Sequence, residues 1–499
     1  MHAMPIDADL AYTQLLARDA AVDGHWFVGV SSTRIYCRPI CRVRTPLRRN
    51  CHFFETAARA EAAGFRPCLK CRPEVAPRAD QARWSVADAA QTLAQQAAAW
   101  FDAQLLSGNA PSVATAAAHL GISERHLRRI FATHHGVTPL HHVQTQRLLL
   151  AKQLLSDSSL PITQVAQASG FGSVRRFNAA FAAHYRMPPS ALRQRARAPG
   201  PDVELRLALG WRPPYDVAGV LRFLAQRAIP GVDQIDSAQA MVRRTLRADL
   251  LGAGSPAAWV EVQWPTGAHR VTLRAPASLA PWSAALGAAV RHWLDLDAQP
   301  DAVQTTLHAL NPTPGLRLPG GVDGFELAVR AVLGQQVTVA AARTLAGRVV
   351  ARAGVPLATP WPDLSHAFPS PLQLLALDAD ALTALGILRG RAAALRALAE
   401  AWPQLQPLCI PGAPPQPLIT ALCALPGIGP WTAHYIAMRA LGWADAWLPG
   451  DVALRKAYAA HTGRPLTPRE ADTPPPAWAP WRAYAVLALW RSLDTRNPP

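Results

Sequence analysis

The most informative segment of the chain is residues 422–458, LCALPGIGPWTAHYIAMRALGWADAWLPGDVALRKAY. It contains a Leu-Pro-Gly-Ile-Gly turn and, further along, a Leu-Pro-Gly-Asp-Val string that holds Asp451. Because Gly427 and Gly429 carry no side chains, backbone N–H groups can approach a phosphate at the N-terminus of the following helix. The segment therefore predicts two helices joined by a phosphate-binding hairpin, and a carboxylate at the start of a third helix.

Three side chains of this segment are candidates for chemistry. Asp451 either caps the helix that follows it or stabilises positive charge on a bound molecule, and the two roles can coexist. Trp431 and Tyr435 are spaced i, i+4, so they share one helix face. Such aromatic residues are often core residues. Beside a carboxylate, however, electron-rich rings also form a pocket that attracts a cationic ligand.

This segment resembles the helix–hairpin–helix DNA glycosylases, and within that superfamily the AlkA-type 3-methyladenine glycosylases. The resemblance covers about residues 204–495. It rests also on the strings WRPPYD (211–216), PGLRLPGGVDGFELAVRAVLGQQVTVAAA (314–342) and PWRAYAVLALW (480–490). The resemblance implies an α+β domain followed by an all-α glycosylase domain.

Residue roles follow from the same resemblance. Asp451 is implied to be the catalytic residue, and Gly427 and Gly429 are implied to contact DNA. In the family an apolar wedge fills the gap left by the extruded base, and this chain has Gln336 at the matching position. The base-binding aromatic residues implied by the resemblance are Trp431, Tyr435, Trp481 and Tyr215.

The expected reaction is hydrolysis of the N-glycosidic bond of an alkylated base. The base must first leave the duplex, and a carboxylate then stabilises the oxocarbenium character of the sugar. Bifunctional members of the superfamily carry a lysine where this chain has Trp431, so we expect no strand cleavage. Cys409 and Cys423 are the only cysteines of this half, so no iron–sulfur cluster is expected.

Residues 203–315 mix strand patterns with helical ones. The strings VELRLALGW (203–211), WVEVQW (259–264) and HRVTLRA (269–275) alternate in hydrophobicity enough to predict strands. Helical periodicity dominates from about residue 320 onward.

Two related segments precede this half, SVATAAAHLGISERHLRRIFATHHGVTP (112–139) and ITQVAQASGFGSVRRFNAAFAAHYRMPP (162–189). Each has a helix, a glycine turn and a second helix that starts after a serine, Ser123 or Ser173, which is a good N-cap. The pair resembles the AraC-type DNA-binding domain, whose second helices lie in successive major grooves. The candidate DNA contacts are Arg125, Arg128, Arg129, Arg175 and Arg176. Alternatively, any one of these arginines is an ordinary solvated charge.

Four cysteines near the N-terminus form two close pairs, Cys37-x3-Cys41 and Cys68-x2-Cys71. Two such pairs can surround one zinc ion tetrahedrally, and Cys51 between them is predicted to be a small buried residue. By spacing alone, a closed structural zinc site is the simplest interpretation.

The local sequence favours a reactive site instead. Residues 31–74 resemble the N-terminal domain of the Ada alkylation-response family, in which a zinc-bound cysteine takes a methyl group from a methylphosphotriester. By this resemblance the matching residue is Cys37, within Tyr-Cys-Arg-Pro. The chemistry agrees, because zinc keeps a ligand cysteine as the thiolate, which is the nucleophilic form. The same resemblance makes Thr33 and Arg44 candidate phosphate contacts. Four further arginines suit a phosphate surface: Arg38, Arg42, Arg48 and Arg49.

The overall charge agrees with a nucleic-acid partner. Lys and Arg total 50 against 33 acidic residues, a net charge of +17. Neither a signal peptide nor a membrane span is expected. We expect a cytoplasmic monomer that binds double-stranded DNA at alkylated bases, methylphosphotriesters and promoters. RNA polymerase is a further expected partner.

The predicted fold is multidomain and mainly α-helical. Four domains are expected: a small α+β zinc domain over residues 1–78, a double helix-turn-helix domain over 82–198, an α+β sheet-and-helix domain over 203–315, and an all-α helix–hairpin–helix glycosylase domain over 316–499. The favoured function is DNA alkylation repair combined with alkylation-responsive transcription regulation. Two alternatives remain: a regulator whose glycosylase half only binds DNA, and an active glycosylase with an inert zinc module.

Overall fold

The computed structural model describes residues 6–78, 89–106, 111–195 and 204–496. It divides into two compact units. The first comprises the chain up to Arg212 together with Leu251–Ser255 and Gly267–Ala288. The second comprises Pro213–Leu250, Pro256–Thr266 and the chain from Ala289 onward. Each unit has its own hydrophobic clusters, and the predicted mainly α-helical, multidomain class is confirmed.

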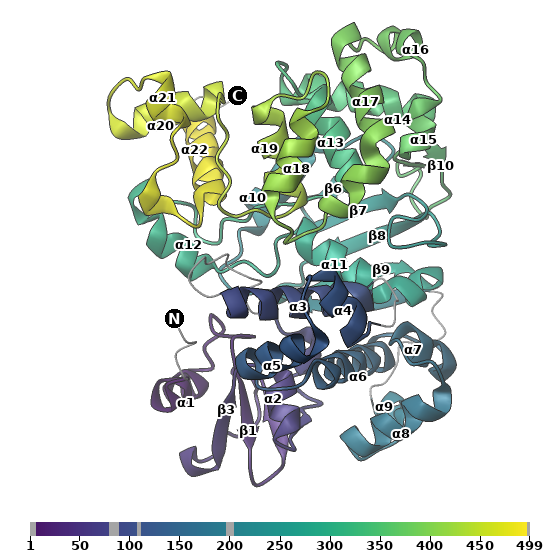
Figure 1. Cartoon of the computed structure of the whole chain (residues 1–499), viewed down its shortest axis with the longest axis vertical. Coiled ribbons are helices and arrows are strands. Elements are labelled where there is room, and N and C mark those ends of the chain that lie inside the picture. The colour runs from purple at the N-terminus through teal and green to yellow at the C-terminus, as the bar shows by residue number, and fades with distance from the viewer. Residues whose placement is uncertain (1–5, 79–88, 107–110, 196–203, 497–499) are drawn as a thin grey trace. The chain divides into compact units, whose positions relative to one another are not determined.

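A small four-stranded sheet of order β3-β1-β2-β4 opens the first unit (Figure 1). β1 (Phe27–Val30) pairs antiparallel with β2 (Ile35–Cys37) and β3 (Cys51–Phe54), and β2 pairs parallel with β4 (Arg66–Pro67). The helices of this part are α1 (Ala8–Ala17) and α2 (Ala57–Ala62). Because β2 ends at Cys37 and β4 runs into Cys68, the parallel pair brings the two halves of the cysteine cluster together.

Helices α3 (Ala89–Leu106) through α9 (Pro189–Arg195) follow in the first unit. The first helix-turn-helix consists of α4 (Val113–His119) and α5 (Glu124–His135), and the second of α7 (Ile162–Ala168) and α8 (Val174–Tyr185). α6 (Pro139–Asp157) connects them. Ser123 and Ser173 cap α5 and α8, as predicted, by accepting hydrogen bonds from the amides of the third residue of each helix.

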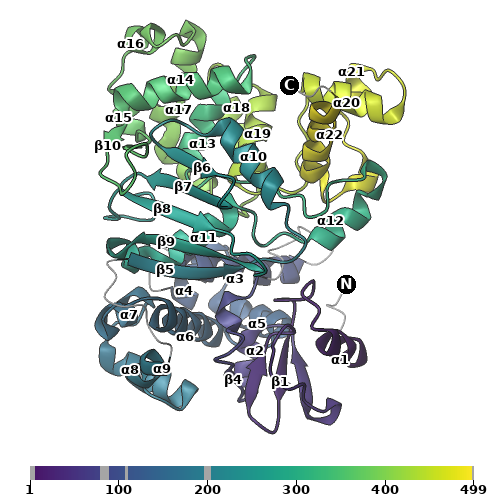
Figure 2. The same ribbon diagram turned by 180° about the vertical axis from the view of Figure 1, so that it is seen from behind.

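Strands occur in both units near the middle of the chain. In the first unit β5 (Glu204–Gly210) pairs antiparallel with β9 (Arg270–Pro276). In the second unit β7 (Met241–Leu246) lies between β6 (Asp233–Asp236) and β8 (Ala258–Gln263), both antiparallel to it (Figure 2). The three predicted strands are therefore present, and β6 and β7 are additional.

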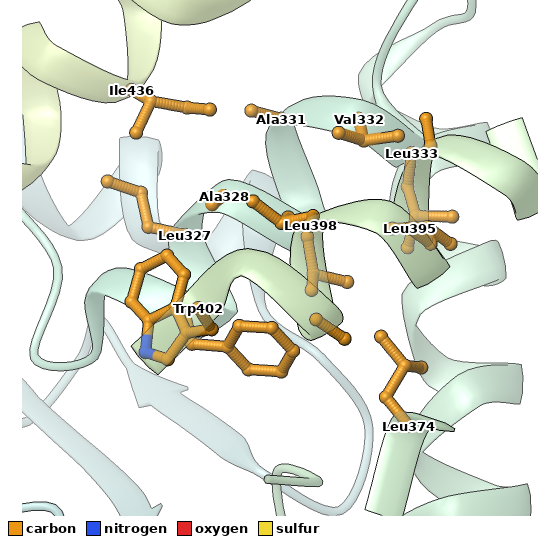
Figure 3. Close-up of a cluster of buried hydrophobic side chains, with 14 of the residues drawn as sticks. Leu327, Ala328, Ala331, Val332, Leu333, Leu374, Leu395, Leu398, Trp402 and Ile436 are labelled. Carbon is orange, nitrogen blue, oxygen red and sulfur yellow. The ribbon is translucent and has the colours of Figure 1, made fainter. Parts of the chain in front are cut away.

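Helices make up most of the second unit. Its principal cluster of buried side chains joins α13 (Gly324–Leu333), α14 (Val339–Ala353), α17 (Arg389–Leu405), α18 (Pro415–Cys423) and α19 (Pro430–Ala440). Figure 3 shows Leu327 and Trp402 facing one another inside it. The other helices described in this unit are α10 (Val217–Arg227), α12 (Pro300–Thr306), α15 (Pro371–Leu375), α16 (Ala379–Ala384), α20 (Val452–Thr462), α21 (Pro468–Asp472) and α22 (Arg482–Arg496). Helix α11 (Ser283–Trp293) begins in the first unit and ends in the second.

Within the described ranges, no helix has both the length and the apolar character needed to cross a membrane.

Candidate active site and metal centre

A cavity of about 470 Å³ opens in the second unit, and its walls come from α10, α13, α14, α19, α20 and α22. Cavities of this size suit a small organic group such as a nucleobase. Three of the sequence-predicted residues, Trp431, Tyr435 and Asp451, line it together. The helix–hairpin–helix segment and the Asp451 loop therefore meet at one site.

Asp451 is the N-cap of α20 and is only 8% exposed. Its Oδ1 accepts a hydrogen bond from the Leu454 amide at 2.6 Å, and its Oδ2 accepts one from Trp431 Nε1 at 2.8 Å. Trp490 Nε1 lies 3.3 Å from Oδ1. The capping and cavity-lining roles coexist, and the donors hold the carboxylate in one orientation.

The aromatic rings of Trp431 and Tyr435 are parallel, with centroids 5.4 Å apart and an interplanar angle of 8°. Burial alone would raise the pKa of Tyr435, but the guanidinium groups of Arg439 and Arg227 outweigh it and lower that pKa. Arg439 donates to the Tyr435 hydroxyl at 2.8 Å and to the Gly320 carbonyl at 3.0 Å. The Tyr435 end of the ring pair is therefore held in place by Arg439, which also lines the cavity.

The cavity also contains residues that sequence analysis did not select. Phe223 on α10 lines it, with the Arg227 guanidinium carbon 3.9 Å from its ring centroid and the Arg439 carbon at 4.8 Å. Trp490 of α22 is a further lining residue. The available signal was the i, i+4 spacing of Phe223 and Arg227 within LRFLAQRA, which places an aromatic ring and a cation on one helix face.

Two predicted base-binding aromatics lie elsewhere, which corrects the sequence-based expectation. Tyr215 is half-buried and lies under Arg317, whose guanidinium carbon is 4.4 Å from its ring centroid, and its hydroxyl donates to the Leu294 carbonyl at 2.6 Å. Trp481 is 6% exposed and packs edge-on against Tyr484. Neither lines the cavity; both belong to the packing around it.

The hairpin turn between α18 and α19 has the expected geometry. Gly427 has φ +77°, and a Cβ there would lie 2.9 Å from the Cβ of Ala394. Glycine is therefore required at this position. Gly429 is the N-cap of α19, so the free amides of the first turn of that helix are available to an anion.

The loop between α13 and α14 lies against this hairpin. Gln335 Nε2 donates to the Gly427 carbonyl at 2.9 Å and to Thr432 Oγ1 at 3.0 Å, while Arg391 donates to the Gln335 carbonyl at 2.5 Å. Gln336, the predicted wedge, is exposed at the tip of this loop with φ +54°. A non-glycine residue in this left-handed region is strained, and such strain is often found at functional sites.

The sulfur atoms of Cys37, Cys41, Cys68 and Cys71 all lie within 4.8 Å of one another. Zn–S bonds of about 2.3 Å place tetrahedral ligands roughly 3.8 Å apart, so the four cysteines fit one zinc ion. Amides of Lys70 and Arg38 donate to the sulfurs of Cys68 and Cys71, each at 3.3 Å. Cys51 is buried outside the cluster, as predicted.

The predicted phosphate-contacting residues of the zinc module separate into two groups. Thr33 and Arg44 are exposed, as are Arg42 and Arg49. Arg38 is 6% exposed and forms an ion pair with Asp23, so it is a buried structural residue rather than part of a phosphate surface. The five predicted arginines of the helix-turn-helix pair are all exposed. Arg128 forms an i, i+4 ion pair with Glu124 at 2.8 Å.

Three known families match the chain. The metal binding domain of Ada matches residues 11–74, a helix-turn-helix domain matches 116–195, and the AlkA N-terminal domain matches 206–323. The probable bifunctional transcriptional activator/DNA repair enzyme AlkA of Mycobacterium tuberculosis (strain ATCC 25618 / H37Rv) is 36% identical over 98% of this chain and 97% of its own length. The chain belongs to this family.

Other relatives match only part of this chain. DNA-3-methyladenine glycosylase 2 of Escherichia coli (strain K12) is 37% identical over 56% of this chain and 95% of its own length. The bifunctional transcriptional activator/DNA repair enzyme Ada of the same organism is 32% identical over 32% of this chain and 42% of its own length. The family relationship confirms DNA as the partner and zinc as the metal of the four-cysteine site.

A half-buried histidine of the AlkA family member, which bonds to the backbone of the cavity residue Arg439, is expected to make the stability of the protein depend on pH. His292 Nε2 donates to the Arg439 carbonyl at 3.1 Å, and burial lowers its pKa to about 4. In the unfolded chain a histidine titrates near 6.5, so its contribution is fully present above that pH and is lost as the pH falls toward 4. We expect the titration of His292 alone to lower the free energy of unfolding by about 2 kcal/mol at pH 5 relative to pH 7.

Urea unfolding at the two pH values tests this expectation. Replacing His292 with glutamine removes the titrating group, so the variant should lose less stability than wild type between pH 7 and pH 5. His461→Gln, at an exposed histidine, is the matched control and should keep the wild-type difference. An unchanged pH dependence in His292→Gln would contradict the assignment.

Proposed function

We propose that the chain is a monofunctional DNA-3-methyladenine glycosylase fused to a methylphosphotriester acceptor and alkylation-responsive regulator. The observation that carries the glycosylase proposal is the Asp451 carboxylate, held at the wall of a base-sized cavity beside the stacked pair Trp431 and Tyr435. An N-alkylated purine with positive charge suits those electron-rich faces.

The reaction follows from this arrangement. The bond between the sugar C1′ and the base nitrogen breaks, and the base leaves with its electron pair. Water supplies hydroxide to C1′ and releases its other proton to the solvent. The fixed Asp451 carboxylate stabilises the developing positive charge and orients the water. Because donors from Trp431 and the Leu454 amide already hold the carboxylate, little reorganisation is needed during the reaction.

The absence of lyase activity is part of the proposal. A lyase needs an amine nucleophile to form a Schiff base with the sugar. Trp431 occupies the position where bifunctional members of the superfamily have that lysine, and its indole is already hydrogen-bonded to Asp451. None of the described residues that line the cavity is a lysine.

DNA engagement by the glycosylase part is proposed for the hairpin glycines and Gln336. The free amides at the start of α19 would bind a backbone phosphate, and exposed Gln336 would enter the gap left by the extruded base. The exposed arginines of α5 and α8 would contact promoter DNA.

The second activity is methyl transfer to Cys37. Bound zinc keeps the ligand sulfurs as thiolates at neutral pH. The Cys37 sulfur attacks the methyl carbon of the phosphotriester, the S–C bond forms, the C–O bond breaks, and the phosphodiester anion leaves. Backbone amides donate to the sulfurs of Cys68 and Cys71, and the backbone of Val43 donates to the sulfur of Cys41, whereas no backbone amide of the described residues donates to the Cys37 sulfur. Since such hydrogen bonds withdraw electron density from sulfur, Cys37 keeps the greater nucleophilicity.

Regulation completes the proposal. Methylating Cys37 removes one negative charge near the DNA backbone and would strengthen DNA binding. The chain is proposed to act as a cytoplasmic monomer that activates transcription through RNA polymerase, with domain boundaries near residues 78, 82, 198, 203 and 316.

The direct test is to incubate the wild-type protein with methylated duplex DNA. We expect released 3-methyladenine, intact strands, and breaks only after heat and alkali reveal abasic sites. Strand breaks without alkali would overturn the monofunctional assignment. Binding without any base release would favour the regulator whose glycosylase half is inactive.

A further inference from the structure

Helix α6, which connects the two helix-turn-helix units, also packs on the zinc module of the same unit. It contacts α2, which lies beside it in Figure 1. It also contacts the 3-10 turn η2 (Pro73–Val75), which begins two residues after Cys71. Charged and polar side chains of both parts meet at this contact, and most of them are buried. Such groups are costly to bury unless each has a partner, so their pairing fixes the geometry of the contact.

The central residue of this contact is Lys152. Its side chain is 1% exposed, and its ammonium donates to the Cys68 carbonyl at 3.1 Å. It also forms an ion pair with Glu74, whose side chain is likewise 1% exposed. Lysine is almost never fully buried unless it is paired. The backbone of a zinc ligand is thus held directly by a helix of the DNA-binding region.

A second link joins the C-terminal end of α6 to the residue after Cys71. Arg72 makes a bidentate pair with Asp157, with distances of 2.6 and 2.7 Å. Arg72 also donates to Glu74 at 3.0 Å, which connects this pair to Lys152. Two residues that follow Cys71, Arg72 and Glu74, therefore form one network with Lys152 and Asp157 of α6.

A third link starts beside Cys37. The Tyr36 hydroxyl donates to Glu61 Oε1 at 2.9 Å, and Thr145 Oγ1 of α6 donates to Glu61 Oε2 at 2.5 Å. Tyr36 is fully buried, and the side chain of Glu61 is 3% exposed. Side chains of α6 thus hold the carbonyl of Cys68 directly. Through Tyr36 and Arg72, they also hold the chain next to Cys37 and Cys71.

We propose that α6 is a structural part of the zinc centre, with Lys152, Asp157 and Thr145 as its positioning residues. Groups just outside a metal's ligands orient those ligands and tune metal affinity. Because α6 holds the residues of the zinc site, metal binding and the order of α6 are energetically coupled, and that coupling is reciprocal. The same helix also connects the two helix-turn-helix units. The proposal concerns the zinc site itself and does not depend on glycosylase activity or methyl transfer.

Zinc release into an excess of a colorimetric chelator tests the role of Lys152. Lys152→Met keeps the aliphatic length and removes the ammonium, and we expect the full-length variant to release zinc about tenfold faster than wild type or more. Lys456→Met is the control, since this exposed lysine of α20 lies in the other unit, and the variant should release zinc at the wild-type rate. A wild-type rate for Lys152→Met would overturn the proposal.

Hydrogen exchange of the wild-type chain tests the same coupling without any substitution. Removing zinc should increase the exchange of amides in residues 145–157, while those of α13 in the other unit keep their protection. If α6 retained its full protection after zinc removal, the helix would be independent of the metal centre and the proposal would fail. This measurement decides the question even if Lys152→Met does not fold.

Discussion

Replacing Asp451 with asparagine is expected to slow release of 3-methyladenine from duplex DNA by about 10²-fold or more. Asparagine has the same shape and is an equally good N-cap, so it can still accept the hydrogen bond from the Leu454 amide. It has no negative charge, and therefore cannot stabilise the cationic sugar. The loss should appear in the single-turnover rate of base release.

The matched control for this change is Asp378→Asn. Asp378 is also an N-cap, of α16, and accepts from the Ala381 amide at 2.7 Å, but it does not line the cavity. The control should retain the wild-type rate, and both variants should keep the wild-type melting temperature within a few degrees. Base release by Asp451→Asn within a few-fold of wild type would remove the carboxylate from the mechanism.

Replacing Cys37 with serine is expected to abolish methyl transfer from methylphosphotriester DNA to the protein. A hydroxyl in place of the thiolate is a far weaker nucleophile at neutral pH. Transfer can be followed as radiolabelled methyl groups that become bound to protein. Cys51→Ser is the control: Cys51 is 6% exposed and Cys37 5%, but Cys51 is not part of the four-sulfur cluster, so transfer should persist.

Loss of a zinc ligand alone could also stop transfer, so the acceptor must be located in the wild-type protein. Peptide mass mapping after exposure to methylated DNA should find the added methyl group on Cys37. A methyl group on Cys41, Cys68 or Cys71 would contradict the assignment and the argument from amide hydrogen bonds. No methylation at any cysteine would favour a zinc module that serves only structure and DNA binding.

The helices and strands were predictable to the extent that local pattern determines them. Alternating hydrophobicity located β5, β8 and β9 to within one residue, and the serine caps located α5 and α8. β6 and β7 were missed. β6 is only four residues long, begins and ends with aspartate and is nowhere fully buried, while β7 carries two adjacent arginines. Pairing with neighbours stabilises such strands, and that information is not local.

The site was predictable where the motif itself carries the chemistry. Asp451, Trp431 and Tyr435 lie within one segment, and all three meet at the cavity. Tyr215 and Trp481 were misplaced because an aromatic residue beside a motif fits a pocket and a core equally well. Arg38 was misplaced because only the fold brings Asp23 to it. Phe223 could be assigned to the cavity only from the tertiary structure, since packing of the fold brings α10 to the cavity.

The three hydrogen bonds of Gln335 have a consequence for how a lesion is found. They hold the loop between α13 and α14, with Gln336 at its tip, against the neighbouring hairpin and Arg391. The loop tip and the hairpin are therefore fixed to one another. On the proposed function, Gln336 would then test each base pair at a constant reach from the strand that the hairpin binds, and a damaged pair would be recognised by how readily the duplex yields rather than by a rearrangement of the protein.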